Sequence, residues 1–303
     1  MEEVGKKKKH DWKRTAFIVG MCIVPILHFL VFYLYVNFDS VMMAFRYLED
    51  GELVWGMKNF KVFFQEFVGP VSEFRPALKN TIIFFCTSLF VVMPLTLMIA
   101  YFLYKKIAGY KFYRVMFFLP NILSAVVMTI VYARLVGRGS PIANMFDAPA
   151  GLLATDRYWL GMSYPMLAIV VYTIWTGFGT NLILMSGAMN RIPEEVLEAA
   201  RLDGVGMVRE LVQIILPMVW PTLTTLIVFT FVGIFTASGP ILLFTKGQYD
   251  TLTISYWILS VVMNPAGDVR YASAVGLVFT IVALPIVLFV KWGMEKLQAA
   301  TEY

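Results

Sequence analysis

The side chains that most often carry chemistry are scarce in this 303-residue chain. Its two histidines, His10 and His28, form no H-E-x-x-H pattern, and its two cysteines, Cys22 and Cys86, each lie inside an apolar run. Metal sites and disulfide frameworks need several such residues at set spacings. The sequence also lacks G-x-x-x-x-G-K-[S/T], the loop that usually cradles ATP phosphates. We therefore expect no catalytic residues, no metal site and no cofactor bound by this chain.

One charged segment, Glu194–Gly204 (EEVLEAARLDG), stands out because its surroundings are uncharged. Five of its eleven residues are charged, between the uncharged runs Tyr158–Asn190 and Leu211–Thr245. Pro193 and the two glutamates after it suit the start of a helix, and Gly204 suits a left-handed stop. Taken alone, the segment is equally typical of a solvated connector.

The bulk composition indicates an integral membrane protein. Hydrophobic residues make up 59% of the chain and charged residues 15%, against about 25% charged residues in soluble domains. Uncharged runs of about twenty residues are long enough to cross a bilayer as helices. The basic residues are scattered among these runs, which argues against nucleic-acid binding. Six such runs predict an all-α membrane protein with six transmembrane helices: Thr15–Asn37, Asn80–Tyr104, Val115–Ala133, Tyr158–Asn190, Leu211–Thr245 and Tyr271–Val290.

The distribution of Lys and Arg predicts the orientation in the membrane. Residues 1–14 carry six of them and residues 105–114 carry four, so both segments are expected in the cytoplasm beside anionic lipid. Counting the shorter run Thr251–Gly267 as a span would move the basic C-terminal tail outside, so we interpret it as a shallow outer helix. With six spans, both termini and the charged segment Glu194–Gly204 lie in the cytoplasm.

The spacing after Glu198 resembles a known motif. Glu198-Ala199-Ala200, then Gly204, Ile214 and Leu216-Pro217 follow E-A-A-x3-G-x9-I-x-L-P. This resembles the EAA loop of ABC-importer permeases. The stretches FLPNILSAVV (118–127) and WTGFGTNLILMSGAM (175–189) are similar to the carbohydrate-type members, the maltose and glycerol-phosphate permeases of bacteria. These importers have two permease subunits. The order of the predicted spans is similar to that of the larger subunit, with one N-terminal helix before a five-helix core.

The resemblance implies a type I ABC importer permease fold and a set of partners. These are a second permease subunit, two ATPase subunits that hold ATP and Mg²⁺, and an extracytoplasmic substrate-binding protein in a bacterial inner membrane. It assigns ATPase coupling to Glu198, Ala199 and Ala200, with Asp203 and Gly204 at the end of the helix. The expected organisation is a basic N-terminus (1–14), a first span (15–37), an outer loop (38–79), a core (80–295) containing the coupling loop (190–217), and a tail (296–303).

The candidate translocation path is uncharged. Aromatic faces and hydrogen-bonding side chains bind sugars, because sugar rings have apolar faces and polar rims. Glycines and threonines also mediate packing between spans, asparagines form interhelical hydrogen bonds, and Trp175 could instead pack against the partner permease. The predicted path residues are Asn121, Trp175, Thr176, Gly177, Thr180, Asn181, Thr230 and Thr236. The resemblance favours 176–181, before the coupling loop, and 230–237, after it. Neither of these two stretches carries several aromatic residues in a row, which leaves the identity of the sugar unspecified.

Two prolines and one alternative complete the predictions. Pro217 and Pro221 lie four residues apart in the fifth span and predict a gating hinge, although static curvature would give the same pattern. The alternative function is a secondary transporter or channel for a small neutral solute. The absence of charged residues from the six runs disfavours proton coupling but not sodium coupling.

Overall fold

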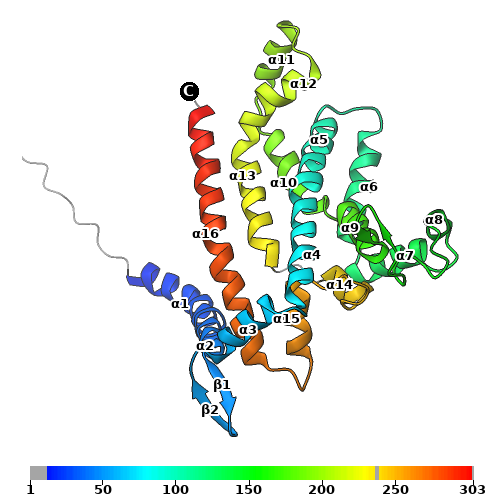
Figure 1. Cartoon of the computed structure of the whole chain (residues 1–303). Coiled ribbons are helices and arrows are strands. Elements are labelled where there is room, and N and C mark those ends of the chain that lie inside the picture. Colours follow the sequence, from blue (N-terminus) through cyan, green and yellow to red (C-terminus); the bar gives the residue numbers. More distant parts are fainter. Residues whose placement is uncertain (1–11, 236–238, 302–303) are drawn as a thin grey trace, which may run out of the picture.

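The computed structural model describes residues 12–235 and 239–301, and its elements are mostly helical (Figure 1). Five helical segments in these ranges are long and apolar enough to cross a membrane: Thr15–Ala44, Phe74–Tyr104, Tyr164–Met189, Met207–Phe235 and Val269–Leu297. A sixth segment consists of two helices, Tyr110–Ile122 and Ala125–Val136, that meet at 107°. With this bent pair counted as one span, the six predicted spans are present.

The N-terminal span is longer than its uncharged run. The helices α1 (Trp12–His28) and α2 (Val36–Ala44) continue through a π-helical segment, η1 (Phe29–Tyr35), and so pass beyond Asn37. A hairpin of β1 (Arg46–Glu49) and β2 (Glu52–Trp55) follows, then α3 (Lys58–Val68). The predicted outer loop 38–79 therefore contains the end of one span and, from Phe74, the start of the next. Helix hydrogen bonds lie within the backbone, so a helix can continue past the residue where charge reappears.

The buried amide of Asn59 attaches the hairpin to the end of this span. Its Nδ2 donates to the carbonyl oxygens of Ala44 at 3.0 Å and Arg46 at 2.8 Å. The hairpin turns at Asp50 and Gly51, which both have positive φ, as the two-residue Asp-Gly turn requires.

The second and third spans are irregular helices. The second consists of α4 (Phe74–Thr87), the π-helical segment η2 (Ser88–Val92) and α5 (Met93–Tyr104). In the third, α6 (Tyr110–Ile122) and α7 (Ala125–Val136) are separated by Leu123 and Ser124 in extended conformation. The run Val115–Ala133 predicts one continuous helix, but two extended residues interrupt the hydrogen-bond ladder and turn the chain aside. The helix α8 (Pro141–Met145) and the strands β3 (Tyr158–Trp159) and β4 (Met162–Ser163) lie between this span and the next one.

The fourth to sixth spans carry the remaining elements. Each is interrupted or extended relative to its apolar run, and the run to Thr245 ends as a span at Phe235. A separate short helix, α15, lies within Thr251–Gly267. Its ten residues rise only about 15 Å, which is too short to cross the bilayer. The elements are α9 (Tyr164–Thr176), α10 (Gly179–Met189), α11 (Glu194–Leu202), α12 (Met207–Arg209), η3 (Glu210–Ile215), α13 (Leu216–Val232), η4 (Gly233–Phe235), α14 (Gly239–Phe244), α15 (Ile254–Met263) and α16 (Val269–Thr301).

The main buried cluster joins α5, α10 and α13, which lie side by side in Figure 1. Leu182, Met185 and Ile215 are fully buried in it. Leu197 of α11 belongs to the same cluster, so a residue of the charged loop packs onto the spans. Burial of one leucine side chain away from water contributes about 1.5–3 kcal/mol to stability. This contact fixes the position of α11 relative to the spans.

Candidate functional site

The helix α11 (Glu194–Leu202) confirms a short helix in the coupling loop and separates its residues into two faces. Leu197 and Ala200 face inward and are each 5% exposed, whereas Glu198 and Ala199 face solvent. The alanines therefore differ in environment: Ala200 permits close packing on the spans, and Ala199 lies on the open face.

The end of α11 has the predicted left-handed glycine. Gly204 has a φ of +68°. Its N–H donates to the Arg201 carbonyl at 3.1 Å, and the Val205 N–H donates to the Ala200 carbonyl at 3.0 Å. These two bonds form a Schellman cap, with Leu202 as the last helical residue and Asp203 as the C-cap. A side chain at position 204 would be strained, so the sharp turn depends on glycine.

The open side of the coupling loop also carries apolar residues that the motif does not include. Leu202 is 89% exposed, Val208 is 76% exposed and Met207 is 53% exposed. The carboxylates of Glu194, Glu195 and Glu198 on α11 are also exposed. In Figure 1, α11 and α12 lie at one end of the bundle, beyond α5 and α13. We call the exposed residues of 194–208 the loop surface.

A buried ion pair lies below the loop surface and was missed by sequence reasoning. Glu210 is 3% exposed, and its carboxylate oxygens lie 2.7 and 2.8 Å from the Lys105 Nζ. The Tyr101 hydroxyl donates to Glu210 Oε1 at 3.4 Å. Glu210 occupies one of the nine unspecified positions of the motif, and nothing in the sequence links it to a lysine 105 residues earlier.

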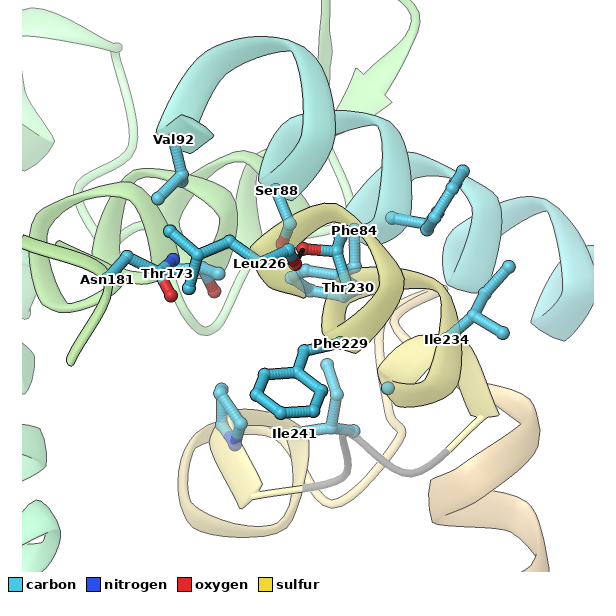
Figure 2. A pocket seen from close by; sticks show the side chains of 14 residues that line it. Phe84, Ser88, Val92, Thr173, Asn181, Leu226, Phe229, Thr230, Ile234 and Ile241 are labelled. Atoms are coloured by element: carbon cyan, nitrogen blue, oxygen red, sulfur yellow. Dashed lines mark hydrogen bonds between the residues drawn. The ribbon is translucent and has the colours of Figure 1, made fainter. Parts of the chain in front are cut away.

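A cavity of about 330 Å³ lies between α4, α9, α10, α13 and α14 (Figure 2). Its polar lining is Ser88, Thr173, Asn181 and Thr230, and its aromatic lining is Phe84, Phe85 and Phe229. No charged residue lines it among the residues that the structure describes. The phenylalanines come from α4 and α13, so tertiary packing brings together aromatic rings from two helices that are far apart in the sequence.

In the described part of the chain, the hydrogen bonds of the cavity leave two polar side chains available, those of Ser88 and Asn181. The Thr173 and Thr230 hydroxyls donate to the carbonyls of Ile169 and Leu226 within their own helices, at 2.9 and 3.0 Å. Within residues 12–235 and 239–301, the Asn181 side chain takes part in no hydrogen bond. Its amide has two donors and an acceptor, which makes it the strongest candidate for contact with a polar ligand.

Three of the eight predicted path residues line the cavity: Gly177, Asn181 and Thr230. Trp175 instead packs beside the aromatic rings of Tyr132 and Tyr172. The Thr176 hydroxyl donates to the Tyr172 carbonyl, and Thr180 is exposed outside the cavity lining. Thr236 lies outside the described residues.

Asn121 makes the interhelical hydrogen bond that was the alternative to ligand contact. Its Nδ2 donates to the Thr176 carbonyl at 3.1 Å, where α9 ends. The span is interrupted at Gly177 and Phe178, and α10 starts at Gly179. A Cβ at Gly179 would lie 2.0 Å from the Asn121 side chain. The glycine therefore permits the close approach of Asn121, whose amide satisfies a carbonyl freed by the helix break.

Replacing Gly179 by alanine is expected to destabilise the protein by about 1–2 kcal/mol, because the added methyl group displaces Asn121 from the Thr176 carbonyl. The measurement is the thermal denaturation midpoint of the purified protein in detergent. Gly187→Ala, on the same helix with nothing within 4 Å of its Cβ position, is the matched control and should be neutral or stabilising. An equal midpoint for the two variants would contradict the close approach.

The prolines of the fifth span lie next to a helix irregularity. The π-helical segment η3 ends at Ile215, immediately before Leu216 and Pro217, and Pro221 lies inside α13. Trp220 between them donates its Nε1–H to the Met294 carbonyl of α16 at 3.1 Å. These contacts describe a locally irregular helix attached to its neighbour. The hinge role stays a prediction.

A helical bundle of up to six spans, with an uncharged cavity and a structured loop at one end, defines a membrane transport subunit. The chain is 27% identical to the probable ABC transporter permease protein YurN of Bacillus subtilis (strain 168), over 93% of this chain and 99% of that protein. It is 27% identical to the lactose transport system permease protein LacF of Rhizobium radiobacter, over 88% and 86% of the two chains. It superposes on a chain of a bacterial ABC transporter involved in alginate import with a TM-score of 0.79, at 23% identity over 94% and 97% of the chains.

The chain belongs to the family of binding-protein-dependent transport system inner membrane components, which matches residues 74–303. The match begins at Phe74, the first residue of α4, so it covers the five core spans. The protein is thus a permease subunit of an ABC importer with the type I fold, and not an enzyme; ATP is hydrolysed by a separate subunit. The alternative of a secondary transporter or channel is set aside.

Proposed function

We propose that this permease forms, with a second permease subunit, the path for a neutral carbohydrate, a sugar or an oligosaccharide. The observation that carries the proposal is the cavity, which combines phenylalanine rings, hydroxyl groups and the unpartnered amide of Asn181 without a charged side chain. Aromatic rings pack on the C–H faces of a sugar, and an amide pairs with its hydroxyl groups.

The names of the relatives support the same substrate class. They include permease proteins for lactose, arabinooligosaccharides and diacetylchitobiose. One solved relative is an alginate importer in complex with an alginate-bound periplasmic protein. Alginate is acidic, whereas the cavity of this chain has no charged lining among the described residues. We therefore favour a neutral sugar.

The coupling role is proposed for the loop surface. Exposure of its leucine, methionine and valine to water costs free energy, and contact with a protein surface removes this cost. Glu198 is exposed on the same surface and can pair with a basic residue of the partner. The partners are two ATPase subunits, which hold ATP and Mg²⁺, and an extracytoplasmic binding protein. Residues 1–14, 190–217 and 296–303 lie in the cytoplasm of a bacterial cell, with membrane lipid around the spans. This chain binds no cofactor itself.

The substrate class is tested on the complete importer in proteoliposomes. We expect the binding protein to bind a neutral mono- or oligosaccharide and to stimulate ATP hydrolysis by the complex when that sugar is present. The measurement is calorimetric binding across neutral sugars, acidic sugars, amino acids and peptides, followed by uptake of the best ligand. An amino acid or a peptide as the best ligand would contradict the carbohydrate assignment and leave the permease assignment unaffected.

A further inference from the structure

The buried contact between Glu210 and Lys105 joins two spans at the end of the bundle that carries the coupling loop. Lys105 directly follows α5, and Glu210 begins η3 six residues after Gly204. Side-chain exposure is 5% for Glu210 and 20% for Lys105. The ammonium group also lies 5.8 Å from the centre of the Tyr101 ring. The two polar partners of the carboxylate, Tyr101 and Lys105, therefore both come from the span that ends with α5.

A buried ion pair needs an explanation because desolvation of the two charges offsets much of their attraction. Apolar residues of similar size would pack at this position without that penalty. Removal of one partner alone leaves an uncompensated buried charge. In some proteins such a pair specifies one arrangement of the elements that it joins.

The same two spans line the cavity farther along the bundle. Ser88 and Val92 of η2 lie on the span that ends at Lys105. Leu226, Phe229 and Thr230 lie on the span that starts beside Glu210. The pair therefore connects the coupling loop to two walls of the cavity, one through each span.

We propose that Glu210 and Lys105 are a positioning pair that makes α11, α5 and α13 move as one unit when the ATPase subunits act on the loop surface. Without the pair, a displacement of α11 reaches α13 through the backbone but reaches α5 only through apolar packing and the long contact between the Tyr101 hydroxyl and the Met207 carbonyl, which permit sliding. The Tyr101 hydroxyl, which lies 3.5 Å from the Met207 carbonyl, orients the carboxylate toward the lysine. This inference rests on the proposed coupling role of the loop surface.

The test follows movement of the cavity wall directly. A cysteine replaces Ser88 in a complete importer whose Cys22 and Cys86 are changed to serine, and its rate of alkylation by N-ethylmaleimide is measured with and without ATP and Mg²⁺. We expect nucleotide to change this rate about fivefold or more in the parent complex. We call the alkylation rate with nucleotide divided by the rate without it the ratio. Lys105→Glu or Glu210→Lys should reduce this ratio to about one, and the double exchange should restore it.

Two controls separate coupling from folding. Arg209→Ala removes the exposed contact to Gln213 beside the pair and should leave the ratio at the parent value. The amount of assembled complex is measured for each variant by co-purification with the ATPase subunits. A pair with a structural role alone would lower that amount and leave the ratio unchanged in the complex that remains. If the charge-reversal variants do not form the complex, Glu210→Gln and Lys105→Met are used instead, and we expect them to reduce the ratio to about one as well.

The failure of this inference is distinguishable from the failure of the coupling proposal. An unchanged ratio in assembled Glu210 and Lys105 variants, together with a lost ratio in Glu198→Arg, would overturn the positioning role alone. A ratio of one in the parent complex, or a normal ratio in Glu198→Arg, would overturn the coupling proposal on which it rests.

Discussion

Glu198→Arg is expected to reduce uptake of the transported sugar about a hundredfold or more while the spans stay folded. Glu198 is exposed on α11, so the substitution breaks no buried contact within this chain. It reverses one charge on the loop surface, where like charges across an interface cost several kcal/mol. The measurement is uptake into proteoliposomes together with ATP hydrolysis stimulated by the binding protein; both should be lost.

The matched control for Glu198 is Glu295→Arg. Glu295 is also exposed, on α16, and its Oε1 lies 3.8 Å from the Lys291 Nζ. Exposed pairs of this kind contribute little, about 0–1 kcal/mol, so uptake should stay near the parent value. Normal uptake by both variants would show that the loop surface does not couple to the ATPase through Glu198.

Asn181→Leu is expected to lower uptake about 10- to 100-fold at a saturating concentration of the loaded binding protein. The substitution keeps the approximate volume of the side chain but removes the amide that is unpartnered in the cavity. Loss of a hydrogen bond to a desolvated sugar hydroxyl costs about 1–3 kcal/mol, which corresponds to this range. Coupling to the ATPase should persist, because Asn181 lies in the span and not in the coupling loop.

Thr180→Val is the matched control for Asn181. Thr180 is the preceding residue of α10, is exposed and does not line the cavity. We expect uptake within about twofold of the parent, since surface substitutions usually change free energies by less than 0.5 kcal/mol. Equal uptake by the Asn181 and Thr180 variants would show that the Asn181 amide does not contact the sugar. A larger loss of uptake in Thr180→Val would show that the sugar passes along a different face of α10.

The coupling loop could be predicted from the sequence because its determinants are local. Proline and two glutamates favour a helix start, and glycine at a fixed distance favours the left-handed stop that Gly204 adopts. The six spans could be predicted for a similar reason, since a bilayer requires about twenty apolar residues whatever their neighbours are.

The departures within the spans have a different cause. The bend at Leu123 and Ser124, the break at Gly177 and the π-helical segments η1 and η2 all lie inside uncharged runs, where every position looks equally apolar. The choice between a straight and a broken helix depends on which neighbouring groups can satisfy the freed backbone. The Asn121 amide does so for the Thr176 carbonyl, and it lies 55 residues away in the chain.

The sequence by itself determined that this chain crosses a membrane and that a short charged helix with a glycine stop lies between two of its apolar runs, whereas the coupling role of that helix stays a proposal. These properties follow from composition, from short-range helix signals and from fixed spacing. The tertiary structure alone decided which phenylalanines meet Asn181 at the cavity, and that Glu210 is buried against Lys105. Such contacts join residues up to 105 positions apart. They depend on how helices pack, and the packing of one helix against another is not encoded in the residue types of either helix alone.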